Sequence, residues 1–579
     1  MYVERIPNRN SPPAILLRES YRDGDKIKKR TLANLSAWSE AKIEALRRVL
    51  REEPVAATDG EGLNILRSLP HGHVAAALGR LRKLRLDRLL SHDGRQPRRE
   101  VALCTAMIVA RLIGPASKLA TARVLDAETA SSSLGQMLDL GEVNERDLYA
   151  TLDWLLAQQQ RIEKSLARRH LHDGTLVLYD VTSTYFEGRT CPLAKLGHSR
   201  DRKRGKLQIM IGLLCTAEGC PIAVEVFEGN VGDPSTVAAQ VDKLKQQFGL
   251  KRVVLVGDRG MLTQARIEET VKPAGLNFIT TLRAPTIQGL LEAGAIQLSL
   301  FDERDLAEIT SPDFPGERLV ACRNPLLADE RRRKRNALIE ATEKELLHIQ
   351  ARVRRAKRAL RGKDKIALAL GKVINKYKMA KHFETTITET DFSFTRKTDQ
   401  IDAEAMLDGV YVVRTDLTSQ MLDATATVRA YKDLANVERA FRCIKTIDLE
   451  VRPIHHRLAD RVRAHVLLCM LAYYLEWHMR QDLRPIIFED HDKAAARTAR
   501  PSIVAKAERS EATEIKAATK RTNDGLPVHS FRSLLADLAT VTRNTMAVGH
   551  NPQTTFVLYP KLTPLQERAF QLLDTQVSL

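Results

Sequence analysis

The chain has 579 residues with a formal net charge of +19, and 44% of its residues are hydrophobic, so it is long enough for several domains with cores of their own. The charge favours polyanions as partners, although a soluble protein with basic helix faces would show the same excess. The most apolar late stretch, from Val466 to Leu475, is shorter than the roughly 20 residues of a membrane span, which excludes a membrane protein and predicts a buried helix.

The N-terminal part is predicted to be a β-hairpin followed by helices. Residues 14–33 alternate as two strands on either side of a turn at Gly24, so we expect a hairpin segment over 1–38. From 39 to 171 the apolar period is helical, and Asn144 is expected to cap the helix that follows it. For this helical domain, a DNA-reading module and a plain helical domain are equally open.

The middle of the chain predicts an α/β core in two parts. Neighbouring strands over 175–180, 208–215 and 221–227 precede an alternation of helices and strands, which indicates an α/β sheet with an antiparallel start. We place the first part of the core at 172–283. The second part, at 409–485, holds a strand over 409–416 and a helix over 424–446.

A large insertion over 284–408 separates the two parts of the core. It opens irregularly, continues as a helical pair over 329–381 that is broken at Gly362, and looks β-like near 385–395. The pair holds 18 Lys and Arg against 6 Asp and Glu, so we expect it to follow a phosphate backbone, with a solvated hairpin or a dimer contact as the alternative. The remaining residues, 486–579, are predicted to be a polar linker and a C-terminal tail.

The seven cysteines form no CxxC pair and show no zinc-ligand spacing, which is typical of a protein in a reducing cytoplasm. The first residues lack the apolar segment of a signal peptide, so we expect a cytoplasmic protein. The sequence has no Gly-Lys-Ser/Thr phosphate loop, and we therefore expect no nucleotide cofactor.

Two of the predicted strands end on an aspartate, Asp180 and Asp258. Open α/β sheets place their ligands at the carboxyl ends of strands, although either aspartate alone could simply cap a turn. Hard divalent cations prefer carboxylate oxygens, and two-metal sites for phosphoryl transfer need several of them. A third acid from another element would complete such a site.

The predicted helix over 424–446 supplies that acid, Glu438, on one of its faces. Tyr431, Glu438 and Lys445 are spaced i, i+7, i+14 and therefore share one face. An ordinary charge ladder has the same spacing, but beside two strand-end aspartates the pattern favours a metal ligand flanked by phosphate contacts. A second stripe, suited to packing on a sheet, consists of Leu434, Val437, Phe441 and Ile444.

These residues resemble the DDE transposases of bacterial insertion sequences, in the group with a Tyr-Arg-Glu-Lys signature. Leu434 stands where the signature has Arg, and Arg439 or Arg442 could supply the missing charge. Further matches to the family are 179–186, 227–230, 256–260, 452–457 and 463–465.

The resemblance implies an α/β fold with a ribonuclease H-like mixed sheet, interrupted by the mostly helical insertion. It implies that Asp180, Asp258 and Glu438 are catalytic and bind two Mg²⁺ or Mn²⁺ ions. It also implies cutting at the element's ends by water, attack of the freed 3′-hydroxyl on target DNA, and a homodimer or larger assembly on double-stranded DNA.

The expected DNA contacts come from the signature helix and from the basic loop over 197–206, whose alternative is a solvated turn. His455, His456 and His465 lack metal-ligand spacing and are expected to be structural or DNA-facing. The candidate DNA-binding residues are Tyr431, Lys445, Arg439, Arg442, Arg202, Lys203, Arg204 and Lys206.

The sequence is also compatible with three other functions. A stand-alone metal-dependent nuclease would cut DNA without joining ends, and a DNA-binding protein with a decayed core would do neither. A basic scaffold protein would have no discrete Mg²⁺ site. Metal-dependent nicking separates the enzymes from the other two.

Overall fold

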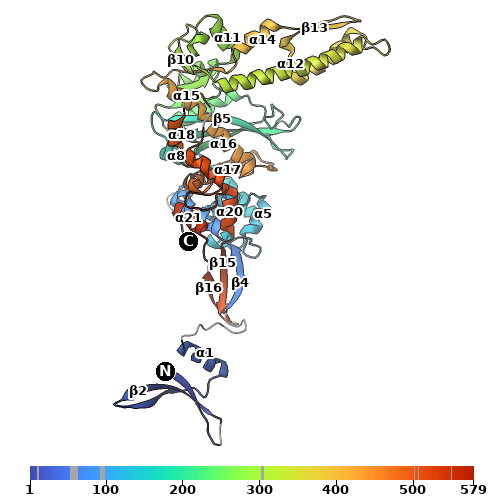
Figure 1. Ribbon diagram of the computed structural model, residues 1–579. Coiled ribbons are helices and arrows are strands. Elements are labelled where there is room, and N and C mark those ends of the chain that lie inside the picture. Colours follow the sequence, from blue (N-terminus) through green and yellow to red (C-terminus); the bar gives the residue numbers. More distant parts are fainter. Residues whose placement is uncertain are drawn as a thin grey trace. The chain divides into compact units, whose positions relative to one another are not determined.

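The computed structural model describes residues 1–9, 12–51, 63–91, 98–201, 203–301, 305–500, 502–505, 508–548 and 551–578. They form two compact units. The smaller unit consists of Met1–Leu69 with Arg543–Pro560, and the larger of Pro70–Thr542 with Lys561–Leu579. Figure 1 shows the elements of each unit.

The smaller unit confirms the N-terminal hairpin and adds strands that were not expected. β2 (Ala14–Asp23) and β3 (Lys26–Asn34) form the predicted hairpin, and β1 (Tyr2–Ile6) pairs antiparallel with β2. Ile15, Leu35 and the Ile43 side chain of α1 (Glu40–Leu50) form its small core.

The expectation that 39–171 is helical throughout was wrong at β4 (Leu63–Pro70). This strand joins β15 (Thr542–Val548) and β16 (Asn551–Leu558) in a sheet of order β16-β15-β4. Its pairing partners lie near the other end of the chain, so no local pattern could reveal them.

The larger unit is built around an eight-stranded mixed sheet of order β10-β11-β14-β9-β8-β5-β6-β7. β5, β6 and β7 are antiparallel neighbours, while β8 runs parallel to β5 and β9 parallel to β8. Three antiparallel strands followed by two parallel ones confirm the ribonuclease H-like core. These strands are β5 (Leu176–Tyr185), β6 (Gln208–Thr216), β7 (Pro221–Glu228), β8 (Val254–Gly257) and β9 (Asn277–Thr281).

The insertion extends this sheet beyond β9. β14 (Val410–Thr415), the predicted strand near 409–416, pairs antiparallel with β9 and with β11 (Arg318–Arg323), and β10 (Leu306–Ile309) follows at the edge. The expectation of an irregular segment over 284–328 was therefore wrong. This segment also contains α11 (Ala284–Glu292).

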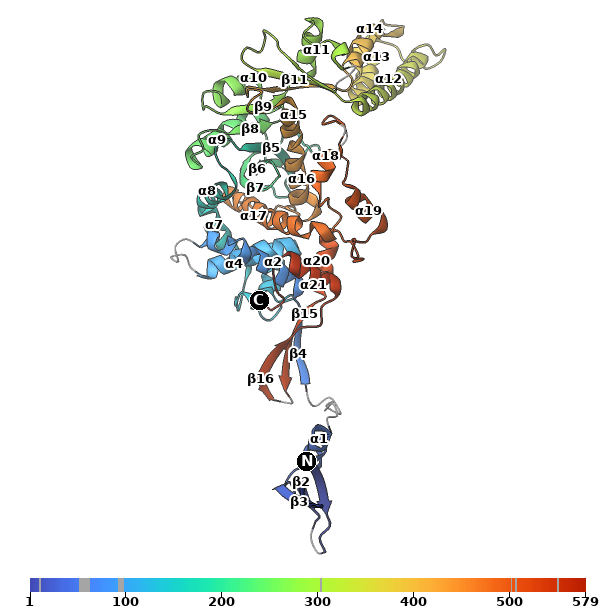
Figure 2. The same cartoon turned by 60° about the vertical axis from the view of Figure 1, so that its left-hand side comes forward.

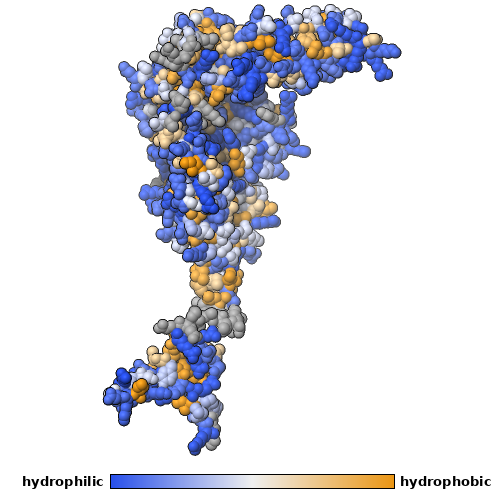
Figure 3. Space-filling view, viewed as in Figure 1, coloured by the Kyte–Doolittle hydropathy of each residue, from blue (hydrophilic) through white to orange (hydrophobic). Residues whose placement is uncertain are grey.

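The basic helical pair is confirmed as α12 (Pro325–Val353) and α13 (Lys363–Tyr377), with Gly362 between them at a φ of +94°. Both pack with the hairpin of β12 (Phe383–Ile387) and β13 (Phe392–Arg396) around a separate hydrophobic cluster. α14 (Thr398–Met406) leads back to β14. Hydrophilic side chains cover most of the visible surface of the larger unit (Figure 3).

Helices cover the sheet, and α17 (Ala459–Leu483) is the central one. It is the predicted buried helix, and it contacts β7 and the helices α4 and α7 (Figure 2). Asn144 caps α7 through a reciprocal hydrogen-bond pair with Asp147, as predicted. The N-terminal helices are α2 (Gly72–Lys83), α3 (Leu86–Leu90), α4 (Arg98–Ile113), α5 (Lys118–Leu125), α6 (Leu134–Met137), α7 (Glu145–Ala157) and α8 (Gln159–His170).

The helices that flank the core strands contain several π-helical turns. α9 (Val237–Asp242) continues as a π-helical segment over Lys243–Gln247, and α10 (Gln264–Arg266) continues likewise over Ile267–Val271. The predicted helix over 424–446 consists of three pieces. They are α15 (Ala424–Lys432), α16 (Leu434–Arg442) and a π-helical turn over Cys443–Ile447.

Within 486–579, where a polar linker and a C-terminal tail were expected, the residues that the structure describes include helices. α20 packs against α2, and its Phe531, Leu534 and Leu538 side chains join the main core. The helices in this region are α18 (Lys493–Ala499), α19 (Glu511–Thr519), α20 (Phe531–Ala539) and α21 (Pro564–Leu572).

Across the described ranges, no single helix is long and apolar enough to cross a membrane. Among the residues that the structure describes, one bent pair, Arg99–Ile113 with Lys118–Leu125, meets that test when its two helices are taken together.

Gly229, at the end of β7, is a sensitive position in the core. A Cβ there would overlap the backbone carbonyl oxygen of Gln208 and crowd that of Lys195. We expect Gly229→Ala to lower the free energy of unfolding by about 2–4 kcal/mol, since the backbone itself would have to shift. In α11, Gly289→Ala meets nothing within 4 Å and should instead stabilise by about 0.5–1 kcal/mol. Denaturant unfolding of both variants checks the pair, and an equal effect of the two would contradict it.

Candidate functional site

The three predicted acids line one cleft of about 640 Å³ in the larger unit. Asp258 follows β8 directly, as predicted, and Glu438 lies in α16. Asp180 was expected to end its strand, but β5 continues to Tyr185, so Asp180 lies in the middle of it.

Strand register explains why the two aspartates meet. β5 and β8 are parallel neighbours, and Tyr179 is paired with Gly257. Asp180 and Asp258 are the next residues on the two strands, so their backbones lie about one strand spacing, ~4.8 Å, apart. α16 packs against β5 through its apolar face, where Val437 and Phe441 are buried, and this places Glu438 beside the same cleft.

The environment of Asp180 in the cleft disfavours its negative charge. Burial raises the pKa of Asp180 to about 7, and the negative charges of Asp258 and Glu438 act in the same direction. The Val181 amide, which donates to Asp180 at 2.8 Å, and the Arg200 guanidinium oppose this rise without cancelling it. A cation in the cleft would stabilise the carboxylate form of Asp180, which burial and, to a smaller extent, the two neighbouring acids disfavour.

Tyr431 lies next to Asp258. Its hydroxyl is 3.5 Å from Asp258 Oδ1 and accepts a hydrogen bond of 3.0 Å from Thr281 on β9. Burial raises the pKa of Tyr431, so the phenol remains protonated and can donate. Tyr431 therefore lines the cleft, close to one of the acids.

Lys445 also lines the cleft, but an acid that the sequence did not single out holds it. Its ammonium donates to Asp201 Oδ1 at 2.6 Å and to the Ser183 carbonyl at 2.6 Å. Lys445 lies in the π-helical turn that follows α16, a deformation that is frequent at functional sites. Despite the interruption at Asp433 and this turn, Tyr431, Glu438 and Lys445 all face one cleft, as the i, i+7, i+14 spacing indicates.

Arg200 and Asp201 are the cleft residues that sequence reasoning missed. Arg200 bonds to the Val181 carbonyl and to Asp233, and both cleft residues belong to the basic loop that was singled out. The signal that could have found Asp201 is its position as the one acid in the run 197–206.

The other candidate DNA contacts are spread over several surfaces. Arg442 and Leu434 line the cleft, whereas Arg439 lines a neighbouring pocket. Arg202 lies outside the described residues. The loop also has three exposed basic side chains that do not line the cleft in the part of the chain that the structure describes. They are Lys203, Arg204 and Lys206.

Comparison with known proteins gives two family matches. The family model of the transposase DDE domain matches residues 171–475, which is more than half of the chain. The model of the N-terminal domain of IS1634 family transposases matches residues 3–59.

No curated protein matches the chain. Among solved structures, the chain is similar to a chain in the structure of a piggyBac transposase synaptic complex with hairpin DNA. The TM-score is 0.29 and the sequence identity 10%, over 67% of this chain and 77% of that chain.

The DDE family match spans the ribonuclease H-like core, from the segment before β5 into α17, and includes the elements that carry all three acids. Domains of this family generally use divalent metal ions. The chain belongs to the DDE transposases of insertion sequences, enzymes that cleave DNA and transfer its strands.

Proposed function

We propose that Asp180, Asp258 and Glu438 are the catalytic acids of this transposase and bind two Mg²⁺ or Mn²⁺ ions. The observation that carries the proposal is their convergence in one cleft, where burial and mutual repulsion raise the pKa of Asp180 to about 7. Only oxygen donors are offered by these three side chains, which suits hard divalent cations.

The bound ions would activate the attacking water or 3′-hydroxyl and stabilise the leaving oxygen. The protein side chains do the positioning. Tyr431 donates its phenolic proton towards Asp258 and orients that carboxylate. Lys445, now bound to Asp201, would exchange this partner for a phosphate oxygen of the DNA strand in the cleft. Arg442 supplies a further cation at the cleft, whereas Arg439 is better placed for DNA that crosses the neighbouring pocket.

DNA is the polymer on which this chemistry acts, and we propose that the transposon ends and the target both bind as duplexes. The exposed loop residues Lys203, Arg204 and Lys206 would hold the backbone near the cleft. The enzyme would work in the cytoplasm as a dimer or larger assembly that holds two ends together.

The basic helices offer a test of backbone binding. Arg333 and Lys334 in α12 and Arg355 and Lys357 beyond its end are exposed. If these four residues track phosphates, changing all four to Gln should reduce the slope of log K against log salt by up to about 4, since each phosphate contact contributes about one. Fluorescence anisotropy with labelled duplex at several salt concentrations measures the slope. An unchanged slope would favour the solvated-hairpin or dimer-contact alternative.

The deciding experiment is cleavage of labelled DNA that carries the element's own ends, in Mg²⁺ or Mn²⁺. We expect wild type to cut at the ends and Glu438→Gln to lose cutting by on the order of 10³-fold, because a ligand of the reacting centre is removed. Glu269→Gln, an exposed change on the segment after α10, serves as the matched control and should cut normally.

The same assay separates the alternatives. Joined products with an unlabelled target plasmid distinguish the transposase from a stand-alone nuclease, which would cut without joining. Normal cutting by Glu438→Gln would remove the three-acid site. Retained DNA binding without cutting in wild type would instead indicate an inactive copy.

A further inference from the structure

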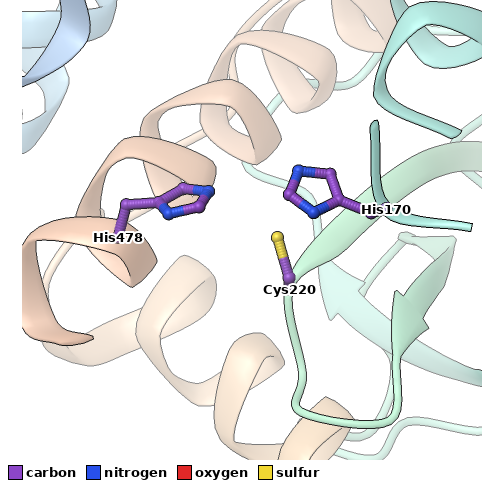
Figure 4. A group of neighbouring side chains, drawn as sticks. All are labelled: His170, Cys220 and His478. Atoms are coloured by element: carbon purple, nitrogen blue, oxygen red, sulfur yellow. The ribbon is translucent and has the colours of Figure 1, made fainter. Parts of the chain in front are cut away.

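A cluster of metal-ligand side chains lies away from the catalytic cleft. His170 is the last residue of α8, Cys220 directly precedes β7, and His478 lies in α17 (Figure 4). One ligand atom of each residue lies within 4.8 Å of those of the other two. None of the three lines the cleft that holds the acids.

The polar atoms of this cluster are prepared for a cation. Nε2 of His478 is buried without a hydrogen-bond partner in the part of the chain that the structure describes. Nε2 of His170 is 2.9 Å from the Tyr474 hydroxyl, which leaves Nδ1 as its ligand atom and orients the ring, as outer-shell partners of metal-bound histidines do.

We propose that His170, Cys220 and His478 bind one Zn²⁺ ion, with a solvent molecule in the fourth position. Two imidazoles and a thiol are the donor types that zinc prefers. A tetrahedral zinc ion would hold the three ligand atoms about 3.3–3.6 Å apart, so they would need to close by at most about 1.5 Å.

The zinc ion would join three parts of the larger unit. It would tie the end of the helical region, the turn between β6 and β7, and α17 to one another. Without a cation, burial raises the pKa of the Cys220 thiol well above its usual range, so it stays protonated. Metal binding would release that proton and charge the sulfur, while Glu218 on the same turn adds a second negative charge nearby.

Zinc content tests the proposal directly. We expect an untagged chain, expressed with zinc and dialysed against metal-free buffer, to retain about one Zn²⁺ per chain by mass spectrometry. Cys220→Ser and His478→Gln should lose it. His172→Gln, an exposed histidine two residues after His170, and Asp180→Asn, which removes a catalytic acid, should retain it.

A spectrum of the wild-type chain covers the case in which the variants fail to fold. Cobalt substitution should give the visible bands of a tetrahedral site and a sulfur-to-cobalt charge-transfer band in the near ultraviolet. Sub-stoichiometric zinc in wild type, or a cobalt spectrum without the sulfur band, would overturn the proposal.

A second, independent feature is a cationic cleft of about 460 Å³ between α5, α7 and the segment before α17. Its lining holds one carboxylate, Glu450, together with three histidines. The cations that line it are Arg111, Lys118, Arg452, Arg457 and Arg461.

Lys118 shows that the charge in this cleft is not balanced. Lys118 is only 6% exposed, and its ammonium group has no hydrogen bond or ion pair with any described residue. Burial and the Arg111 charge lower the pKa of Lys118 to about 7. The carboxylates nearby are already engaged, since Glu450 lies 3.8 Å from Arg532 and Asp153 bonds to Arg461.

The cationic cleft adjoins the catalytic cleft through one side chain. Arg452 lines the cationic cleft and stacks over the Tyr185 ring at 4.1 Å. It also lies 4.0 Å from Asp201, the acid that holds Lys445. A strand that leaves the catalytic cleft past Lys445 would therefore reach Arg452 next.

We infer that the cationic cleft binds a backbone phosphate of the DNA strand that occupies the catalytic cleft. This inference rests on the proposed function, since it takes DNA as the occupant of the catalytic cleft. A phosphate would supply the anion that Lys118 lacks, and the arginine guanidinium groups would add directed hydrogen bonds.

Removing the lysine should act in opposite directions on the free protein and on the complex. Lys118→Met should raise the thermal midpoint of the free chain, because an uncompensated buried charge is removed, and should weaken end binding by roughly 10-fold. Lys164→Met, an exposed change on α8, should leave both unchanged. A purely structural role for Lys118 predicts a lower midpoint instead and would overturn the inference.

Phosphate neutralisation locates the contact. In wild type, a methylphosphonate at one position near the cut should weaken DNA binding. Lys118→Met should bind this modified DNA as well as unmodified DNA, whereas a methylphosphonate at any other position should affect both proteins equally. Binding is measured without divalent metal, so a failure of the catalytic proposal does not affect the result. Stabilisation by inorganic phosphate together with an identical methylphosphonate profile in both proteins would assign the cleft to a free anion and overturn the DNA inference.

Discussion

Replacing Asp180 by Asn should abolish strand cleavage and at the same time stabilise the metal-free protein at alkaline pH. The first effect follows from the proposed role of Asp180 as a metal ligand, and we expect a loss on the order of 10³-fold or more. The second follows from its environment, because burial and two neighbouring acids oppose its negative charge. A residue that only maintains the fold would not show this combination.

The sign of the pH dependence follows from the direction in which the pKa moves. The pKa of Asp180 rises from 3.8 to about 7 in the folded protein, so between these values the folded state holds a proton that the unfolded state has released. Stability from this group is therefore complete below pH 4 and falls as the pH rises towards 7. A tenfold change in an acid dissociation constant corresponds to about 1.4 kcal/mol. The free energy of unfolding of Asp180→Asn should therefore exceed that of wild type by up to a few kcal/mol at alkaline pH and by little at acidic pH.

Thermal unfolding of wild type and Asp180→Asn in chelator, at pH 5 and pH 8, measures this difference. Adding Mg²⁺ should raise the midpoint of wild type more than that of the variant, because binding to the folded state stabilises it. Asp242→Asn is the matched control, since Asp242 is an exposed aspartate at the end of α9. If Asp180→Asn is less stable than wild type at pH 8, the electrostatic account is contradicted.

Replacing Arg480 by Met should destabilise the larger unit by about 3–5 kcal/mol, because it removes the cation that three acids share. The guanidinium donates to Glu476 at 2.6 Å, Glu489 at 2.7 Å and Asp448 at 2.8 Å, and it lies over the Phe531 ring of α20 at 4.5 Å. The side chains of Glu476 and Asp448 are 0% and 4% exposed. Leaving buried acids without a partner is far costlier than losing a surface pair.

Arg463→Met provides the control on the same helix. Arg463 pairs with Asp460 at 2.8 Å, but both side chains are exposed, so its loss should cost less than about 1 kcal/mol. Denaturant unfolding followed by far-ultraviolet circular dichroism compares the two variants. A cost for Arg480→Met no larger than for Arg463→Met would mean that the acids are neutral and that the network does not hold α17 to α20.

The sequence alone determined the parts of this protein that depend on local pattern. The hydrophobic run in α17, the strands before Asp180 and Asp258, the N-cap at Asn144 and the break at Gly362 are all visible within a window of a few residues. The spacing of Tyr431, Glu438 and Lys445 was also sufficient to place them in one cleft, because helical geometry carries over a turn-sized interruption. The domain boundaries and the roles of the site residues stay predictions.

Only the tertiary structure decided which distant segments meet. β4 pairs with strands from the other end of the chain, and β10 and β11 are stabilised by the sheet edge that β14 offers rather than by their own pattern. The partner of Lys445, the ligand cluster at His170 and the unpaired charge of Lys118 arise in the same way. Local periodicity reports which face of an element is buried, whereas these contacts depend on which other element covers that face, and that is set by the packing of the whole core.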